Sequence, residues 1–355
     1  MPTKKTRTST TGKKTTKKAM SGKTAAASKK LSKPMRALAA VIIVLAILYY
    51  VWQNYGDSIA DSADPVGADF LDAHGETGQT GTQPARPPAG SASLPGNSEA
   101  DKLRIYSFNI QIFGASKMKK TNVVDVLVDI ISHADVAAVQ EVRSTSDEPV
   151  QQFMMLLPAQ YDYVLGPREG RTASKEQYWV IYNTEKLSVV DSATYDDSDD
   201  RFQRSPLAVY FRTKDRFDFI LINNHIQPSD AEKEIAALPE AIRYFQRMWN
   251  ESDALVVGDF NADGIYYNEN KLASVFPDSD YQIVITNEYN TTVAESDNTY
   301  DRFIITASSK EDFTGNFGVV YYDAVYDFPS LGIEPKEVSD HFPVWAEFYI
   351  GRDTD

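Results

Sequence analysis

Polar side chains stand at the ends of several apolar runs that predict strands. The stretch ALVVGDFNAD, residues 254–263, begins as a buried strand and ends in Asp259, Asn261 and Asp263. Five other predicted strands begin or end next to polar residues of the same kind, namely Asn109, Glu141, His225, Asp301, and the pair Asp340 and His341. A single such residue is usually a helix cap or a turn, but strand ends in layered α/β folds can present groups to a shared cleft. The sequence therefore predicts that these side chains form one site.

The residue types at these strand ends suit a divalent cation and acid–base chemistry. Asn, Asp and Glu oxygens are ligands for hard cations such as Mg²⁺, Mn²⁺ and Ca²⁺. The chain has no cysteine, and the predicted domain has only His225 and His341 besides His133, which disfavours a structural zinc site. Two histidines beside carboxylates suit general acid and base roles near neutral pH. Together the residues indicate a metal-assisted hydrolase, with phosphate ester cleavage as the main candidate.

Charge is distributed unevenly along the chain. The formal net charge is −14, from 36 Lys and Arg against 50 Asp and Glu. Residues 1–36 contain twelve of the bases and no acid, which leaves 24 bases and 50 acids, a net charge of −26, in the rest. Such an acidic body repels polyanions at long range, so an anionic substrate would need cations to screen it. The absence of cysteine excludes disulfides and leaves the redox compartment open.

Three segments precede residue 101. Residues 1–36 form a low-complexity Lys/Thr/Ser tail that is predicted to be disordered. Residues 37–56 begin with sixteen apolar residues, which would span roughly 24 Å as a helix, and we expect a transmembrane anchor there. The positive-inside rule then leaves the N-terminus in the cytoplasm and residues 57–355 outside. A cleaved signal peptide and a secreted protein are the alternative. Residues 57–100 are a Gly/Pro/Ser-rich flexible linker.

From residue 101 onward, apolar runs predict alternating strands and helices. Helices are expected at 119–134 and 230–250. Strands are expected at 103–110, 135–142, 177–183, 207–213, 217–226, 254–261, 300–306, 317–323 and 343–350. Helices alternate with strands at first, and hairpin-like spacing follows in the middle. This pattern predicts mixed sheets covered by helices in one α/β domain, residues 101–355.

Six short motifs, in order along the chain, resemble the endonuclease/exonuclease/phosphatase superfamily. They are FNI, QEVR, NNH, GDFNAD, YDR and SDHFPV. The sequence is most similar to the deoxyribonuclease I branch, through the segments at 170–183, 202–211 and 291–305. The resemblance covers about residues 103–349. It implies a four-layered α/β/β/α sandwich, with two mixed β-sheets packed face to face and the site at one end of them.

The resemblance also implies a role for each site residue. Asn109, Glu141 and Asp340 would surround a divalent metal, Mg²⁺ or Mn²⁺, with Ca²⁺ as a further alternative. Asp259 and Asn261 would position the attacking water or a second cation. Two arginines would contact substrate phosphates, Arg143 and Arg204.

The resemblance implies that two histidines act as base and acid on opposite sides of the phosphorus. His341 would pair with Asp301, and His225 would pair with Glu176. The leading hypothesis is therefore a monomeric catalytic domain, tethered to a membrane, that cuts DNA to give 5′-phosphate ends.

Two other functions remain open. A sphingomyelin or phospholipid phosphodiesterase of the same superfamily would suit a membrane anchor, although the sequence shows no long apolar hairpin for insertion into lipid. An inactive binding module on a stalk is the third hypothesis, and it would have little reason to keep six intact motifs.

Overall fold

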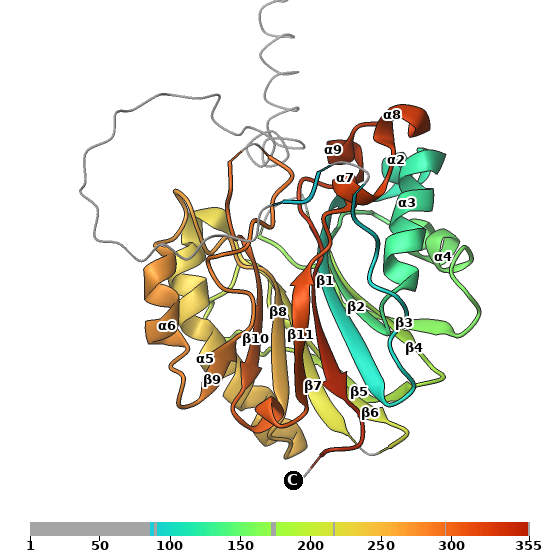
Figure 1. Cartoon of the computed structure of the whole chain (residues 1–355). Helices are drawn as coiled ribbons and strands as arrows, with labels where there is room; N and C mark the ends of the chain where they lie inside the picture. Colours follow the sequence, from blue (N-terminus) through green and yellow to red (C-terminus); the bar gives the residue numbers. More distant parts are fainter. Residues whose placement is uncertain (1–85, 89–90, 172–174, 216, 295, 354–355) are drawn as a thin grey trace, which may run out of the picture. The chain divides into compact units, whose positions relative to one another are not determined.

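The computed structural model describes residues 86–88, 91–171, 175–215, 217–294 and 296–353 (Figure 1). All of them belong to one compact unit. The predicted tail, the predicted anchor at 37–56 and most of the predicted linker lie outside the described residues. Within the described ranges, no helix has the length and apolar character needed to cross a membrane.

Two six-stranded mixed sheets form the centre of the domain (Figure 1). The first has the order β11 (Phe313–Val319), β12 (Val344–Tyr349), β1 (Lys102–Phe113), β2 (Val136–Val142), β4 (Gln177–Asn183) and β3 (Tyr161–Leu165). The second has the order β5 (Leu187–Thr194), β6 (Leu207–Thr213), β7 (Asp218–His225), β8 (Ala254–Asp259), β10 (Asp301–Thr306) and β9 (Tyr281–Ile283). Each sheet has one parallel pair, β1–β2 or β7–β8, and its other pairs are antiparallel.

Three apolar layers hold the sheets and helices together. Buried side chains such as Ile105 of β1 and Leu221 of β7 fill the layer between the two sheets. Helices α3 (Thr121–Ser132) and α4 (Glu148–Met154) pack on the outer face of the first sheet, and α5 (Ala231–Trp249) packs on the outer face of the second. Each fully buried Leu, Ile or Phe contributes about 1.5–3 kcal/mol. The result confirms the predicted α/β/β/α sandwich.

The central strands and the long helix follow directly from the sequence. Every residue of β2 and β4 is buried, as expected for continuous apolar runs inside a covered sheet. Helix α5 is amphipathic and ends at Asn250, whose left-handed conformation (φ 52°) closes the helix. The other helices are short: α2 (Ala115–Met118), α6 (Leu272–Val275), α7 (Tyr322–Val325), α8 (Phe328–Leu331) and α9 (Pro335–Val338).

The strand predicted at 317–323 is wrong in its second half. Strand β11 ends at Val319, and the chain then turns into α7, where Tyr322 is fully buried against the helical side of the first sheet. Strands β3, β5 and β9 were not predicted. All three are edge strands, and β5 buries only one of its eight residues, so its apolar pattern is weak.

The chain ahead of β1 packs along the domain as a strap, defined as residues 86–88 and 91–101. At its start, the Arg86 guanidinium pairs with the Asp323 carboxylate and lies 5.0 Å above the ring of Phe342. At its end, Lys186 Nζ donates to the Glu99 carbonyl at 3.1 Å. The strap therefore enters the domain beside α7 and runs to the start of β1, at the opposite end of the first sheet.

Candidate active site

The predicted site residues meet at one end of the two sheets, where both parallel strand pairs end. Asn109 and Glu141 lie near the ends of β1 and β2, and His225 and Asp259 end β7 and β8. Strand register places Asp259 directly opposite both His225 and Asp301. A cleft of about 310 Å³ opens here. It is lined by Glu141, His225, Gln227, Pro228, Ser229, Asp259, Asn261, Tyr266, Tyr300, Asp340 and His341.

Unusual backbone conformations bring these strand ends together. Glu141 (φ 63°) and Asn261 (φ 48°) both adopt left-handed conformations, which cost about 1–3 kcal/mol each for residues other than glycine. Gly258 has φ 145°, and a Cβ atom there would lie 1.7 Å from the Asn224 carbonyl oxygen. Only glycine therefore lets β8 approach β7 closely enough to place Asp259 beside His225.

His225 forms a pair with Glu176 that two arginines support. Its Nδ1 atom lies 2.8 Å from Glu176 Oε2, while Glu176 Oε1 accepts hydrogen bonds from Arg143 (2.7 Å) and Arg204 (3.0 Å). Burial alone would raise the pKa of Glu176, but Arg204, His225 and Arg143 outweigh it and lower that pKa. Burial and Arg204 oppose a charged His225, yet Glu176 and Asp259 raise the pKa of this histidine above its usual value.

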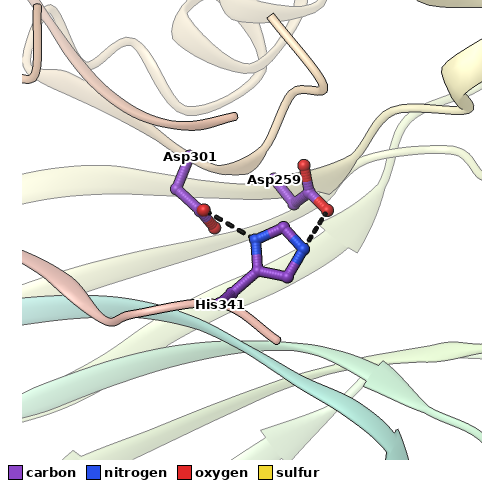
Figure 2. A group of neighbouring side chains, drawn as sticks. All are labelled: Asp259, Asp301 and His341. Atoms are coloured by element: carbon purple, nitrogen blue, oxygen red, sulfur yellow. Dashed lines mark hydrogen bonds and ion pairs between the residues drawn. The ribbon is translucent and has the colours of Figure 1, made fainter. Parts of the chain in front are cut away.

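His341 forms a second pair, with Asp301, in different surroundings. Figure 2 shows the imidazole between two carboxylates: Nδ1 is 2.7 Å from Asp301 Oδ2, and Nε2 is 3.4 Å from Asp259 Oδ2. Asp301 is completely buried, which raises its pKa to about 6 although His341 opposes the shift. Burial disfavours the imidazolium, but Asp301 and Asp259 outweigh burial, so the pKa of His341 is well above its usual value.

Asp259 connects the two pairs. Its Oδ2 atom lies 3.5 Å from His225 Nε2 and 3.4 Å from His341 Nε2, and it accepts a 3.0 Å hydrogen bond from Asn109. Its Oδ1 atom accepts from the Asn261 backbone at 3.0 Å. The Nε2 atoms of both imidazoles therefore point toward the same oxygen atom, Oδ2 of Asp259.

Two of the three residues predicted to hold a metal, Glu141 and Asp340, line the cleft, and the third, Asn109, is fully buried beside Glu141. Asn109 Nδ2 donates to Glu141 Oε1 at 3.0 Å. Within the described chain, Asp340 Oδ1 is buried and accepts no hydrogen bond. Burial raises the pKa of Asp340; His341 opposes this rise, and Glu141 adds to it. Such carboxylates, close together with unused oxygen lone pairs, fit a hard divalent cation.

A second group of possible ligands lies beside the first. One ligand atom each from Asp259, Asp301 and His341 lies within 4.8 Å of the others. Each imidazole nitrogen of His341 already faces a carboxylate oxygen, so a cation there would have to replace one of these contacts. Asn109, Glu141 and Asp340 therefore suit a cation better.

The two arginines predicted to contact substrate phosphates are buried against Glu176. Besides that contact, Arg143 Nε lies 3.5 Å from Glu141 Oε2, and Arg204 Nε donates to the His225 carbonyl at 3.2 Å. Their observed contacts orient the His225 pair. The phosphate role stays a prediction.

Several residues that position the site were not predicted. The Tyr178 hydroxyl accepts a 2.9 Å hydrogen bond from the His225 backbone. Ser339 Oγ donates to the Asn109 carbonyl at 2.6 Å and accepts from the His341 backbone at 3.1 Å. Tyr178 and Ser339 lie inside or beside the recognised motifs, but only the fold shows which backbone groups they reach.

Comparison with known proteins identifies the family of this chain. A model of the endonuclease/exonuclease/phosphatase family matches residues 106–341. The chain belongs to this family, and it is thereby placed among nucleases and phosphatases that hydrolyse phosphate esters.

Curated relatives include deoxyribonucleases. Human deoxyribonuclease-1 is 32% identical over 264 residues, which cover 69% of this chain and 92% of the human protein. Deoxyribonuclease-1-like 1 of Cricetulus griseus is 31% identical over 268 residues, with 72% and 86% covered. These similarities confirm the resemblance to the deoxyribonuclease I branch.

Similarity to solved structures supports the fold and nothing beyond it. Truncated Caenorhabditis elegans TDP2 has a TM-score of 0.51 at 13% identity, with 70% of this chain and 98% of that chain covered. The catalytic domain of human Nocturnin has a TM-score of 0.50 at 15% identity, with 74% and 98% covered.

Proposed function

We propose that this protein is a divalent-metal-dependent endonuclease that hydrolyses DNA and leaves 5′-phosphate ends. The observation that carries the proposal is the pair of buried imidazoles, His225 and His341. The Nε2 atoms of both face the same oxygen of Asp259, and a separate carboxylate holds each Nδ1. The similarity to proteins named deoxyribonuclease-1 supports DNA as the substrate.

His341 is the general base in this proposal. Its Nε2 accepts a proton from a water molecule as the water oxygen forms a bond to phosphorus. Asp301 accepts a hydrogen bond from Nδ1–H, which fixes the reactive tautomer and stabilises the imidazolium that forms. The neighbouring carboxylates favour proton uptake because they raise the pKa of His341 against the opposing effect of burial.

His225 is the general acid. Its Nε2 donates a proton to the leaving 3′ oxygen as the bond between that oxygen and phosphorus breaks, so the products are a 3′-hydroxyl and a 5′-phosphate. Glu176 holds the imidazolium, and Arg204 favours proton release because it lowers the pKa of His225.

Asn109, Glu141 and Asp340 would hold the divalent cation, with Mg²⁺ or Mn²⁺ as the proposed ion. When bound, the cation supplies Lewis-acid polarisation of the scissile phosphate and neutralises developing charge. A cation also screens DNA from the acidic surface of the protein, whose residues after 36 carry a net charge of −26 (24 bases and 50 acids).

A nicking assay on supercoiled plasmid tests the proposed reaction. The full chain with Mg²⁺ is expected to nick the plasmid, EDTA is expected to abolish nicking, and added Mg²⁺ or Mn²⁺ is expected to restore it. Activity that persists in EDTA would contradict the role of the metal. A folded protein that leaves plasmid intact but hydrolyses sphingomyelin would support the phospholipid alternative instead.

We also propose a location. The sixteen apolar residues that begin the segment 37–56, together with the basic tail before them, support a single-pass anchor with the catalytic domain outside the cytoplasm. Alkaline extraction of membranes tests this proposal: an anchored chain stays in the membrane pellet at full length. A shortened, freely soluble chain would support signal-peptide cleavage and secretion.

A further inference from the structure

Lys117 is a buried cation beside the catalytic cleft that the proposed reaction does not use. Its side chain lies on the short helix α2, and the residue is 8% exposed. The Nζ atom donates three hydrogen bonds, to the carbonyl oxygens of Ile110 (2.6 Å), Gln111 (2.6 Å) and Val338 (2.8 Å). Because an ammonium has three N–H donors, all of them are used on backbone carbonyl groups.

The three carbonyl groups belong to the two segments that carry the predicted metal ligands. Ile110 and Gln111 directly follow Asn109 on β1, and Val338 stands two residues before Asp340. Val338 lies 221 residues after Lys117 in sequence. A single ammonium therefore joins them at the point where their ligands must converge.

The same contacts stabilise a segment of β1 whose backbone conformation is unfavourable. Gln111 and Ile112 have φ values of 41° and 50°, and the β1–β2 register shifts between Asn109 and Phe113. This irregular segment supplies two hydrogen bonds to the ligands: Gln111 N donates to Asn109 Oδ1 at 3.0 Å, and Ile112 N donates to Glu141 Oε2 at 2.9 Å. Without the ammonium, three carbonyl oxygens would converge in a buried space and lack this donor, which is costly.

The charge of Lys117 also acts on two of the predicted metal ligands, Asp340 and Glu141. Burial lowers the pKa of Lys117 to about 8, while Asp340 and Glu141 oppose that shift, because a positive charge nearby is favourable to both carboxylates. The ammonium therefore offsets part of the negative charge of these acids, while its hydrogen bonds go to the backbone beside them.

We propose that Lys117 is a positioning residue of the metal site, and this inference rests on the function proposed above. Its ammonium fixes the end of β1 to the segment before Asp340, and so sets the spacing of Asn109, Glu141 and Asp340 that a divalent cation requires. The ligand chemistry concerned is a hard divalent cation, with Mg²⁺ as the probe.

The matched variants are Lys117→Met and Lys120→Met in the full chain. Methionine keeps an unbranched apolar side chain and removes the ammonium. Lys120 lies three residues further on, is exposed, and pairs with Glu337 at 2.9 Å, so it controls for the loss of a nearby positive charge. The Mg²⁺ dependence of two properties is measured: plasmid nicking and the midpoint of thermal unfolding.

Outer-shell partners of a metal typically contribute 10- to 100-fold to affinity. Lys117→Met is therefore expected to need about 10- to 100-fold more Mg²⁺ for half-maximal nicking and for half-maximal thermal stabilisation, while Lys120→Met matches the wild type in both. A Lys117→Met protein that is less stable without Mg²⁺ but has unchanged Mg²⁺ midpoints would have lost only a structural contact, and the inference would be wrong.

Two further outcomes separate this inference from the proposed function. If Lys117→Met does not fold, Lys117→Gln replaces it, since a neutral amide retains two donors; unchanged Mg²⁺ midpoints in that variant would overturn the inference. If the wild type does not nick DNA, Mg²⁺-dependent stabilisation still tests Lys117. No stabilisation of the wild type by Mg²⁺ would overturn the metal site and the role of Lys117 together.

Discussion

The two histidine–carboxylate pairs are alike in geometry and different in electrostatic surroundings. In both, Nδ1 lies 2.7–2.8 Å from a buried carboxylate, and Nε2 lies 3.4–3.5 Å from Asp259 Oδ2. Two arginines contact the carboxylate of the His225 pair. The charged groups that most affect His341 are carboxylates, those of Asp301, Asp259 and Asp340.

This difference explains how two similar pairs can have opposite roles. Positive charge beside His225 favours loss of its proton, and negative charge around His341 favours gain of one. When the surroundings of two titratable groups act on their pKa values in different ways, the groups can serve as acid and base at one pH. The geometry is common to both pairs, and the charge around each imidazole is the property in which they differ.

The largest expected effect comes from removal of either imidazole. His341→Ala and His225→Ala should each reduce the plasmid-nicking rate by about 10²–10⁴-fold, because general acids and bases contribute that much. A synthetic phosphodiester with a p-nitrophenolate leaving group needs little acid catalysis. That substrate should restore the relative rate of His225→Ala and not of His341→Ala, and equal recovery by both variants would contradict the assignment of base and acid.

A smaller effect is expected when the partner of the base is neutralised. Asp301 raises the pKa of His341, so Asp301→Asn should lower it and move the acidic limb of the rate–pH profile to lower pH. The maximal rate should also fall, by at least about tenfold but less than in His341→Ala. The profile of kcat/KM against pH for both proteins measures this, and an unmoved acidic limb would separate Asp301 from the base.

Removal of the arginine beside the His225 pair should change the rate less than removal of the Asp301 charge does. Arg204 lowers the pKa of His225, so Arg204→Met should raise it, and the alkaline limb of the same profile should move to higher pH. Glu176 keeps its hydrogen bond to Arg143 in this variant, so the pair should remain assembled. A shift of the acidic limb instead would assign His225 as the base.

The smallest effect concerns stability rather than rate. Glu234 on α5 is 1% exposed and accepts hydrogen bonds from the backbones of Gln203 (2.9 Å) and Gln227 (3.2 Å). Gln203 directly precedes Arg204, and Gln227 lies two residues after His225. Burial raises the pKa of Glu234 to about 7 from 4.5.

The folded state therefore binds more protons than the unfolded state between these two pH values. The free energy of unfolding should consequently decrease as pH rises through this window. Glu234→Gln cannot titrate, so urea unfolding of the variant should lack this decrease. Parallel pH dependences in both proteins would show that Glu234 is charged throughout.

The sequence predicted which polar residues lie together better than it predicted the edges of the fold. Strands β4 and β6 have the predicted bounds, because their buried runs end sharply at polar residues. The edge strands β3 and β9 are short, and β5 buries only one of its eight residues, so none of the three carries a strong apolar pattern. Residues far apart in sequence were correctly expected to meet, since the order of the motifs matched a known family.

Roles that depend on side-chain direction were harder to predict. Arg143 and Arg204 stand in the expected motifs, but the sequence does not show that both guanidinium groups turn inward to Glu176. Lys117 lies close to Lys119 and Lys120, and a group of lysines is typical of a solvated helix face. Only the fold shows that one of the three is buried among carbonyl groups.

The strap determines where the protein can be attached to a surface or to a fusion partner. It brings the chain into the domain at Arg86, beside Asp323 and Phe342, and Phe342 directly follows His341. The other terminus is at the far end of the sheets, where the Asp353 carboxylate accepts from the Asp218 backbone at the start of β7. A bead, tag or carrier domain joined ahead of Arg86 would stand on the side of the cleft, whereas one joined after Asp353 would stand at the opposite end of the sheets.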